Sequence, residues 1–206
     1  MDEKKLNFLT QALGVFMKYG IKSVTMDELA RQLCISKKTV YTFVKDKNEL
    51  VEACLFIAHQ KELDDIDEIC ETEKNAIDEL LSIGVIISER LKSIHPSIFF
   101  DLQRYHAEAF NKFNKVSQTF IKSCVITNLE KGIKQGFYRK NMDTEIMARM
   151  YLLFIDSLFR SEIFPTTEFG FNTVYSEYFR YHIRGISNEK GLKYLAEIIK
   201  TNNYDL

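Results

Sequence analysis

Three helix-start signals follow one another closely near the N-terminus, and their spacing restricts the local fold to helices joined by tight turns. Thr25 and Glu28 are spaced as a capping box, in which the threonine oxygen accepts a first-turn N–H and the glutamate returns to the N–H of the cap. Ser36 is a favourable N-cap for a second helix, and Asp46 with Glu49 repeats the box before a third. The sequence therefore predicts two short helices followed by a longer one.

Apolar residues at helical spacing give each short helix one side to bury. We expect an amphipathic helix over residues 3–19, ended by Gly20, to pack over this side. The methyl group of Ala30 would let another helix cross closely. The positions predicted to be buried are Met26, Leu29, Ala30, Leu33, Val40, Phe43 and Val44.

The other side of the second short helix is basic and rich in hydroxyl groups. Lysine ammonium groups neutralise phosphates and reach guanine O6 or N7, while threonine and tyrosine offer hydroxyls beside apolar atoms. Two closely joined helices with such a side are typical of a helix-turn-helix in the DNA major groove. Ordinary surface helices with solvated lysines are the alternative, and the agreement of caps, apolar pattern and basic side disfavours it. We predict DNA contacts from Thr25, Ser36, Lys37, Lys38, Thr39, Tyr41, Thr42 and Lys47.

This segment resembles the DNA-binding domain of the TetR family of one-component bacterial transcription regulators, in the stretches FLTQALGVFMKYGIKSVTMDELA and ISKKTVYTFVKDKNEL. The later stretches NLEKGIKQGFYRKNMDTEIMARMY and RGISNEKGLKYL also resemble parts of that family. Two positions depart from its pattern. Cys34 stands in the turn where glycine is usual, so a positive φ there would cost about 1 kcal/mol. Lys38 replaces a small residue, which bears on base preference rather than on DNA binding itself.

The composition favours an all-α protein. Only two prolines and eight glycines occur, with no long alternation of Val, Ile and Thr, which indicates roughly nine helices. We expect an N-terminal three-helix helix-turn-helix domain over residues 1–48 and a C-terminal helical domain for ligand binding and dimerisation over 49–206. The net charge is −1, yet residues 1–50 hold nine Lys/Arg against six Asp/Glu. The basic excess therefore lies with the predicted DNA contacts.

The helical segments near residues 143–160 and 169–186 carry apolar residues on more than one side. Such helices must pack against apolar surface on two sides, so we expect a homodimer with a four-helix interface. The alternative is that both segments are central core helices of one chain. Two-fold symmetry would set two recognition helices about one DNA turn or a multiple apart, which predicts an approximately palindromic operator. Aromatic richness favours a small, mainly apolar effector. The resemblance to the TetR family places the effector cavity in the segment that holds His106. The predicted ligand contacts in and near that segment are Phe100, Tyr105, His106, Phe110, Tyr151 and Phe154.

Other chemistry has little support in the sequence. No Ser-His-Asp, GxSxG, P-loop, GxGxxG or HExxH pattern is present, so we expect no enzyme and no cofactor. His59 and Glu62 have i, i+3 spacing, but the acidic run from Glu62 to Glu73 is more typical of a solvated helix face than of a metal site. The cysteines form no CxxC pair, and we expect reduced thiols in a cytoplasmic protein with no membrane segment. A thiol sensor at Cys34 is a weaker alternative.

These features predict a ligand-responsive transcriptional repressor. Effector binding in the C-terminal domain would shift the helix after Asp46, change the separation of the two helix-turn-helix units and release the DNA. A difference of about 1 to 3 kcal/mol in effector affinity between the two states would suffice. An all-α dimeric carrier that binds small molecules without reading DNA is the alternative, and salt-dependent, sequence-selective binding to a duplex distinguishes the two.

Overall fold

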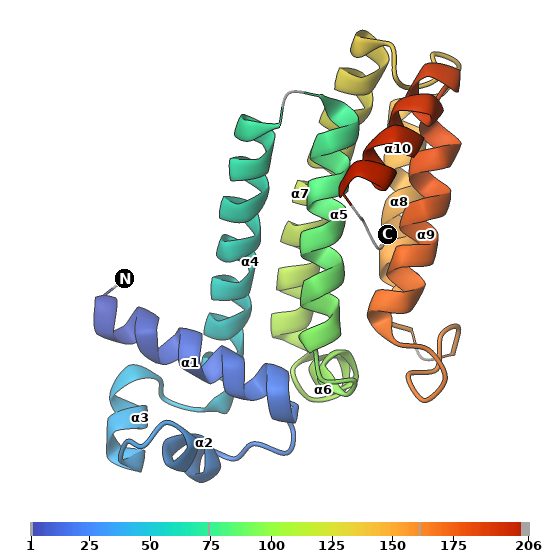
Figure 1. Cartoon of the computed structure of the whole chain (residues 1–206). Coiled ribbons are helices and arrows are strands. Elements are labelled where there is room, and N and C mark those ends of the chain that lie inside the picture. Colours follow the sequence, from blue (N-terminus) through green and yellow to red (C-terminus); the bar gives the residue numbers. More distant parts are fainter. Residues whose placement is uncertain (1, 74, 161, 203–206) are drawn as a thin grey trace. The chain divides into compact units, whose positions relative to one another are not determined.

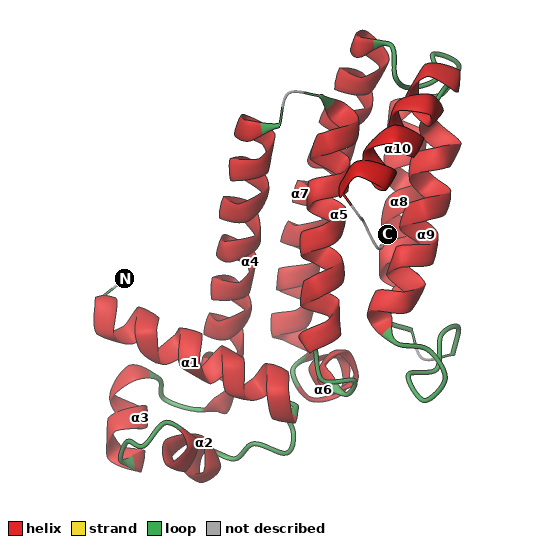
Figure 2. Ribbon diagram, in the orientation of Figure 1, coloured by secondary structure: helices red, strands yellow, loops and turns green. Residues whose placement is uncertain are grey.

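A computed structural model describes residues 2–73, 75–160 and 162–202, and these residues form helices joined by short connections (Figure 1, Figure 2). The described ranges contain ten helices, slightly more than expected, because the stretch around residues 97–110 breaks at His106 and a new helix starts at Ala107. The helices are α1 (Glu3–Tyr19), α2 (Met26–Gln32), α3 (Lys37–Phe43), α4 (Lys47–Thr72), α5 (Ala76–Ser93), α6 (Ile98–Tyr105), α7 (Ala107–Gln135), α8 (Thr144–Leu158), α9 (Phe171–Ile186) and α10 (Glu189–Asn202).

Packing divides the chain into two compact units, each made from two stretches of sequence. The N-terminal unit runs to Asp64 and also includes Ser93–Ser117, and the C-terminal unit comprises Asp65–Lys92 and the residues from Gln118 on. Helix α6 and the first part of α7 therefore pack with the helix-turn-helix. The functional division into a DNA-binding domain, 1–48, and a ligand-binding domain, 49–206, stays a prediction.

Helix α1 is central to the N-terminal unit, because its apolar side chains Phe8, Leu9, Ala12 and Phe16 are buried. Phe8 stacks on Phe43 of α3 with the ring centroids 4.7 Å apart. Of the predicted buried positions, Leu29, Ala30, Val40 and Val44 are confirmed, while Met26, Leu33 and Phe43 are only partly buried. The remaining core residues include Leu9, Ala12, Phe16, Leu50, Cys54, Ile98 and Leu102, so α6 contributes to the same core as α1 to α4.

Large side chains fill the C-terminal unit and press against two glycines. Tyr138, which follows α7, and Phe179 of α9 are at most 1% exposed. A β-carbon at Gly132 would lie 2.1 Å from the Tyr138 ring, and one at Gly84 would lie 2.5 Å from the Phe179 ring. Glycine is therefore required at both positions by close packing.

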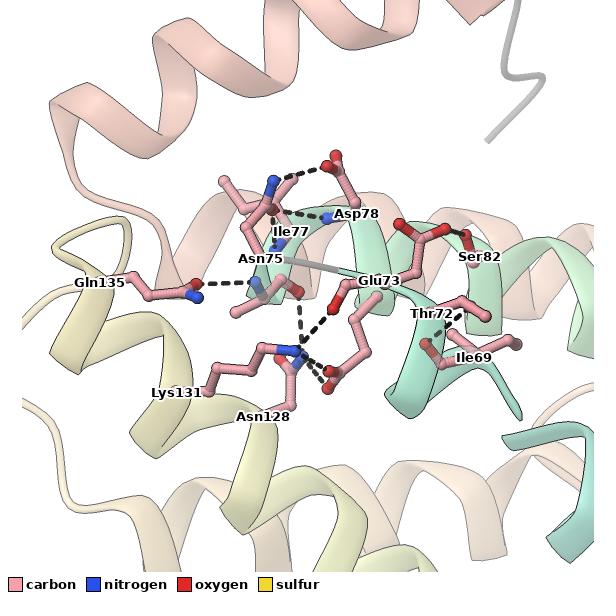
Figure 3. Close-up of polar contacts among 12 residues, drawn as sticks. Ile69, Thr72, Glu73, Asn75, Ile77, Asp78, Ser82, Asn128, Lys131 and Gln135 are labelled. Atoms are coloured by element: carbon pink, nitrogen blue, oxygen red, sulfur yellow. Dashed lines mark hydrogen bonds and ion pairs between the residues drawn. The ribbon is translucent and has the colours of Figure 1, made fainter. Parts of the chain in front are cut away.

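A buried polar network joins α5 to α7 in this unit (Figure 3). Glu79 is 3% exposed, accepts a hydrogen bond from Asn128 at 2.7 Å and forms an ion pair with Lys131 at 2.5 Å. The Tyr138 hydroxyl donates to the Asn128 side chain at 3.0 Å. The first N–H groups of α5 are also satisfied, since Gln135 Oε1 accepts from Ala76 and Asn75 Oδ1 accepts from Ile77 and Asp78. The start of α5 is thus fixed against α7.

Candidate nucleic-acid interface

All three predicted helix starts are made by the expected side chains. Thr25 Oγ1 and Ser36 Oγ each accept the backbone N–H three residues further on, at 3.1 and 3.0 Å, and Asp46 Oδ1 does the same at 2.9 Å. These bonds satisfy N–H groups that a helix leaves without an internal partner. They fix the starts of α2, α3 and α4.

The second bond of each predicted capping box, from the N–H of the cap residue to the glutamate carboxylate, is not formed, so this part of the prediction is wrong. The Glu28 carboxylate accepts from Arg31 and Gln32 of its own helix rather than from the N–H of Thr25, because residues three and four positions apart share a helix face. Glu49 Oε2 accepts from the N–H of Lys45 at 2.9 Å, one residue before the cap. The helix starts therefore depend on the Thr, Ser and Asp side chains.

The turn between α2 and α3 contains a strained residue. Cys34 has a φ of 54° and, within the described residues, is the one non-glycine residue with a positive φ. The sequence left the sign of this angle open, and the positive value costs about 1 kcal/mol for an L side chain. Hydrogen bonds from the N–H of Cys34 to the Arg31 carbonyl and from the N–H of Ile35 to the Ala30 carbonyl hold the turn closed.

Helix α3 buries one side and leaves the other in solvent. Val40 is fully buried, whereas Tyr41 is 43% exposed despite its large ring. The other predicted contacts of this helix are placed together with Tyr41: Ser36, Lys37, Lys38 and Thr42 are exposed and Thr39 is half-buried. Thr25, at the start of α2, is also exposed. The geometry suits a surface that meets a phosphate backbone and base edges, and DNA contact by these residues stays a prediction.

The hydroxyl groups of α3 already serve the helix itself. Ser36 Oγ lies 2.7 Å from Thr39 Oγ1 in addition to its capping bond, and Thr42 Oγ1 donates to the Thr39 carbonyl at 2.6 Å. Lys38 and Tyr41 are therefore best placed to form new polar contacts with a partner, whereas Lys37 already forms an ion pair with Asp27 of α2 at 2.6 Å.

Lys47 has a different environment from the lysines of α3. Its ammonium group donates to the carbonyl of Ile21 at 2.6 Å, and partial burial lowers its pKa. The side chain ties the first turn of α4 to the connection between α1 and α2. A phosphate contact from Lys47 stays a prediction, and such a contact would compete with this hydrogen bond.

A buried carboxylate of α6 holds the same connection. Asp101 is 3% exposed, and its Oδ2 accepts the N–H of Lys22 at 2.9 Å and the hydroxyl of Ser97 at 3.1 Å. The Lys22 ammonium donates to the hydroxyl of Tyr105 at 2.7 Å and lies 4.7 Å from the centre of that ring. Asp101 was not predicted from the sequence, because its partner lies 79 positions away in the chain.

The six predicted ligand residues fall into two groups. Phe100 is 60% exposed and Tyr105 is 45% exposed and bonded to Lys22. His106 is half-buried at the break between α6 and α7, and burial, with Lys47 nearby, lowers its pKa. Phe100, Tyr105, His106 and Phe110 belong to the N-terminal unit, and Tyr151 and Phe154 to the C-terminal unit. Their role in ligand binding stays a prediction.

Tyr151 and Phe154 join an aromatic cluster between α8 and α9. Phe154 stacks on Tyr178 with the centroids 3.5 Å apart, and Tyr151 meets the His182 ring at 5.1 Å. Burial lowers the pKa of His182 to about 4, so its imidazole is neutral near pH 7. Tyr178 and His182 were not predicted as ligand contacts, although their i, i+4 spacing places them on one face of α9.

The described residues offer little sign of other chemistry. No three or more His, Cys, Asp or Glu side chains among them are grouped so as to hold a metal ion. Burial raises the pKa of the Cys54 thiol to about 12, whereas Cys34 is exposed. None of the helices in the described ranges is long and apolar enough to cross a membrane.

Comparisons with known proteins converge on one family. Residues 8–54 match the model for bacterial regulatory proteins of the tetR family. The chain is 26% identical over 145 residues to YvaF and 30% identical over 179 residues to YhgD, two uncharacterized HTH-type transcriptional regulators of Bacillus subtilis. These alignments cover 68% and 75% of this chain and 73% and 83% of the relatives. A transcriptional regulator from Cytophaga hutchinsonii has a similar fold, with a TM-score of 0.70 at 17% identity over 91% of this chain and all of the other.

Proposed function

This chain belongs to the TetR family of bacterial regulatory proteins, and from that premise we propose that it is a repressor that binds an approximately palindromic operator as a homodimer. A small, mainly apolar effector would release it from the DNA. Members of this family are DNA-binding regulators, not enzymes. The observation that carries the proposal is the group of Lys37, Lys38 and Tyr41, which faces solvent on a helix whose opposite side is buried at Val40.

The outer sides of α8 and α9 support a homodimer. Ile146, Met150 and Leu153 of α8 follow i, i+4, i+7 spacing and are 57%, 55% and 71% exposed, and Tyr181 of α9 is 77% exposed. The inner sides of both helices are buried within the C-terminal unit, for example at Leu158, so this apolar outer side has no partner in the described part of one chain. A second copy would cover it, and the resulting two-fold symmetry would present two α3 helices to successive DNA turns.

Effector control would act through the connection between α1 and α2. Lys47 of α4 bonds to Ile21 and Asp101 of α6 bonds to Lys22, so a shift of either helix would move the connection that leads into α2. Effector affinities that differ by about 1 to 3 kcal/mol between the two states would suffice. The aromatic cluster between α8 and α9 would supply an apolar surface for the effector.

Selection of bound duplexes from a random DNA pool tests the proposal. We expect one approximately palindromic sequence to be enriched, with binding that weakens steeply as salt rises and exceeds non-specific binding by about a thousandfold or more. Tyr41→Ala should weaken binding without lowering the melting temperature, because the side chain is exposed. Ligand binding with no duplex preference would instead identify a small-molecule carrier. Since DNA is the proposed partner, we place the protein in the cytoplasm.

A charge placed on α8 tests the dimer. Leu153→Glu should convert the dimer to a monomer in analytical ultracentrifugation and abolish tight operator binding. Val116→Glu on α7, which is 54% exposed, is the matched control and should leave both unchanged. If Leu153→Glu remains a dimer, α8 does not form the dimer interface.

A further inference from the structure

An ion pair links the two short helices on their exposed side. Lys37 Nζ, at the first position of α3, lies 2.6 Å from Asp27 Oδ1 in the first turn of α2. The two side chains are 56% and 67% exposed. Exposed ion pairs contribute little to stability, so the fold gives no strong reason for this pair.

Asp27 is an unexpected residue for a DNA-facing surface. A carboxylate repels phosphates, and it neutralises the very lysine that would otherwise contribute to the basic side. The other carboxylate on α2, Glu28, is bound by Arg31 and Gln32 of the same helix. Asp27 is therefore the acidic side chain of α2 that reaches the predicted DNA contacts of α3.

The pair offers a donor and an acceptor at one place. An aspartate can accept a hydrogen bond from the N4 amino group of cytosine, and a lysine can donate to O6 and N7 of guanine in the major groove. The hydroxyl groups of Ser36 and Thr42 already serve the helix, which leaves few other polar groups on this side. At a mismatched sequence the carboxylate would face a base acceptor in place of the cytosine amino group, and such a repulsive element increases selectivity.

We propose that Asp27 and Lys37 act together as a specificity-determining pair, in which Lys37 donates to a guanine and Asp27 accepts from a neighbouring cytosine. The pair also keeps Lys37 away from the phosphates. The inference rests on the proposed function, because it concerns which sequence the helix-turn-helix selects. Asp27 was not among the DNA contacts predicted from the sequence.

The two variants should have different effects on the preference for particular bases and on the salt dependence of binding. Asp27→Asn would free Lys37 to contact a phosphate, so the slope of log affinity against log salt should become steeper by about one per protomer, or about two per dimer. Affinity for unrelated duplexes should rise, and the ratio of specific to non-specific affinity should fall about tenfold. Lys37→Ala alone should lower the preference at one base pair of each half-site and leave the salt slope nearly unchanged.

The experiment uses the full chain with duplexes enriched from a random pool by the unmodified protein. Affinities are measured by fluorescence anisotropy at several salt concentrations for the unmodified chain, Asp27→Asn, Lys37→Ala and the double variant. Glu71→Gln at the exposed end of α4 makes the same charge change outside α2 and α3, and it should change neither the slope nor the ratio. The double variant should regain the original slope.

Two negative results have different meanings. If Asp27→Asn keeps the enriched sequence, the affinity ratio and the salt slope of the unmodified chain, the specificity-determining pair is refuted while the repressor proposal stands. If the unmodified chain enriches no sequence at all, the repressor proposal fails, and this inference fails with it. A drop in the melting temperature of Asp27→Asn that accounts for its altered binding would also overturn the proposal, since the pair would then be structural.

Discussion

Replacing Gly20 by alanine should destabilise the N-terminal unit for two separable reasons. Gly20 ends α1 with φ 81° and ψ 157°, a backbone conformation that is essentially restricted to glycine. A β-carbon at this position would also lie 2.7 Å from the hydroxyl oxygen of Ser97 and 3.3 Å from Nδ1 of His95. Both neighbours belong to the segment around α6 that holds the connection into α2.

The two effects have similar magnitudes. A residue forced into this backbone region costs about 1 to 3 kcal/mol, and overpacking against a fixed neighbour costs about 1 to 3 kcal/mol more. We therefore expect Gly20→Ala to lower the free energy of unfolding by about 4 kcal/mol, the middle of the range of about 2 to 6 kcal/mol that the two costs give together. For a chain of this length each kcal/mol shifts the melting temperature by about 2 to 4 °C, so the melting temperature should fall by about 8 to 16 °C.

Two other glycines provide matched controls for differential scanning calorimetry. Gly136, after α7, has φ 75° but no atom within 4 Å of its β-carbon position, so Gly136→Ala should show the backbone cost alone, about 1 kcal/mol. Gly14, within α1, has neither constraint, and Gly14→Ala should raise stability by up to about 1 kcal/mol. A loss at Gly20 no larger than at Gly136 would refute the close packing of α6 against this turn.

Three further predictions concern the core of each unit. Ala30→Leu should cost about 1 to 3 kcal/mol by overpacking, measured by urea unfolding, and unchanged stability would contradict close packing of another helix at this buried position. Glu79→Ala should cost about 3 kcal/mol because it leaves Lys131 and Asn128 without their shared acceptor, whereas Glu79→Gln should cost less; equal losses would contradict this role of the hydrogen bond. Since the folded pKa of His182, about 4, lies below its ordinary value of 6.5, the unfolded chain binds the proton more tightly. Stability should therefore be full above about pH 6.5 and fall by up to about 3 kcal/mol toward pH 4. His182→Phe should flatten this part of the pH profile of urea midpoints, and an unchanged profile would exclude His182 as its cause.

Local signals allowed most of the helix-turn-helix to be predicted from the sequence. The caps at Thr25, Ser36 and Asp46 depend on residues three positions apart. Burial of Val40 follows from apolar periodicity over a few turns. Such features depend on residues that lie within about a dozen positions of one another, so the sequence pattern alone predicts them.

Contacts between distant segments could not be predicted in the same way. The place of Lys47 at a helix start predicts a phosphate contact, but it does not indicate that the ammonium group donates to the carbonyl of Ile21. Nothing in the sequence pairs Asp101 with Lys22, and nothing in a glutamate such as Glu79 marks it as buried. Each of these depends on how helices cross, which a periodic pattern does not specify.

The N-terminal unit is made from two separate stretches of the chain, and the ribosome synthesises one of them well before the other. Ile98 and Leu102 complete the core around α1, but they follow the helix-turn-helix by about fifty residues. At roughly 5 to 20 residues per second, a ribosome needs several seconds to pass from residue 48 to residue 117. A nascent chain therefore carries α2 and α3 before it has the segment that completes their core, and the N-terminal unit can be complete only after residue 117 has been made.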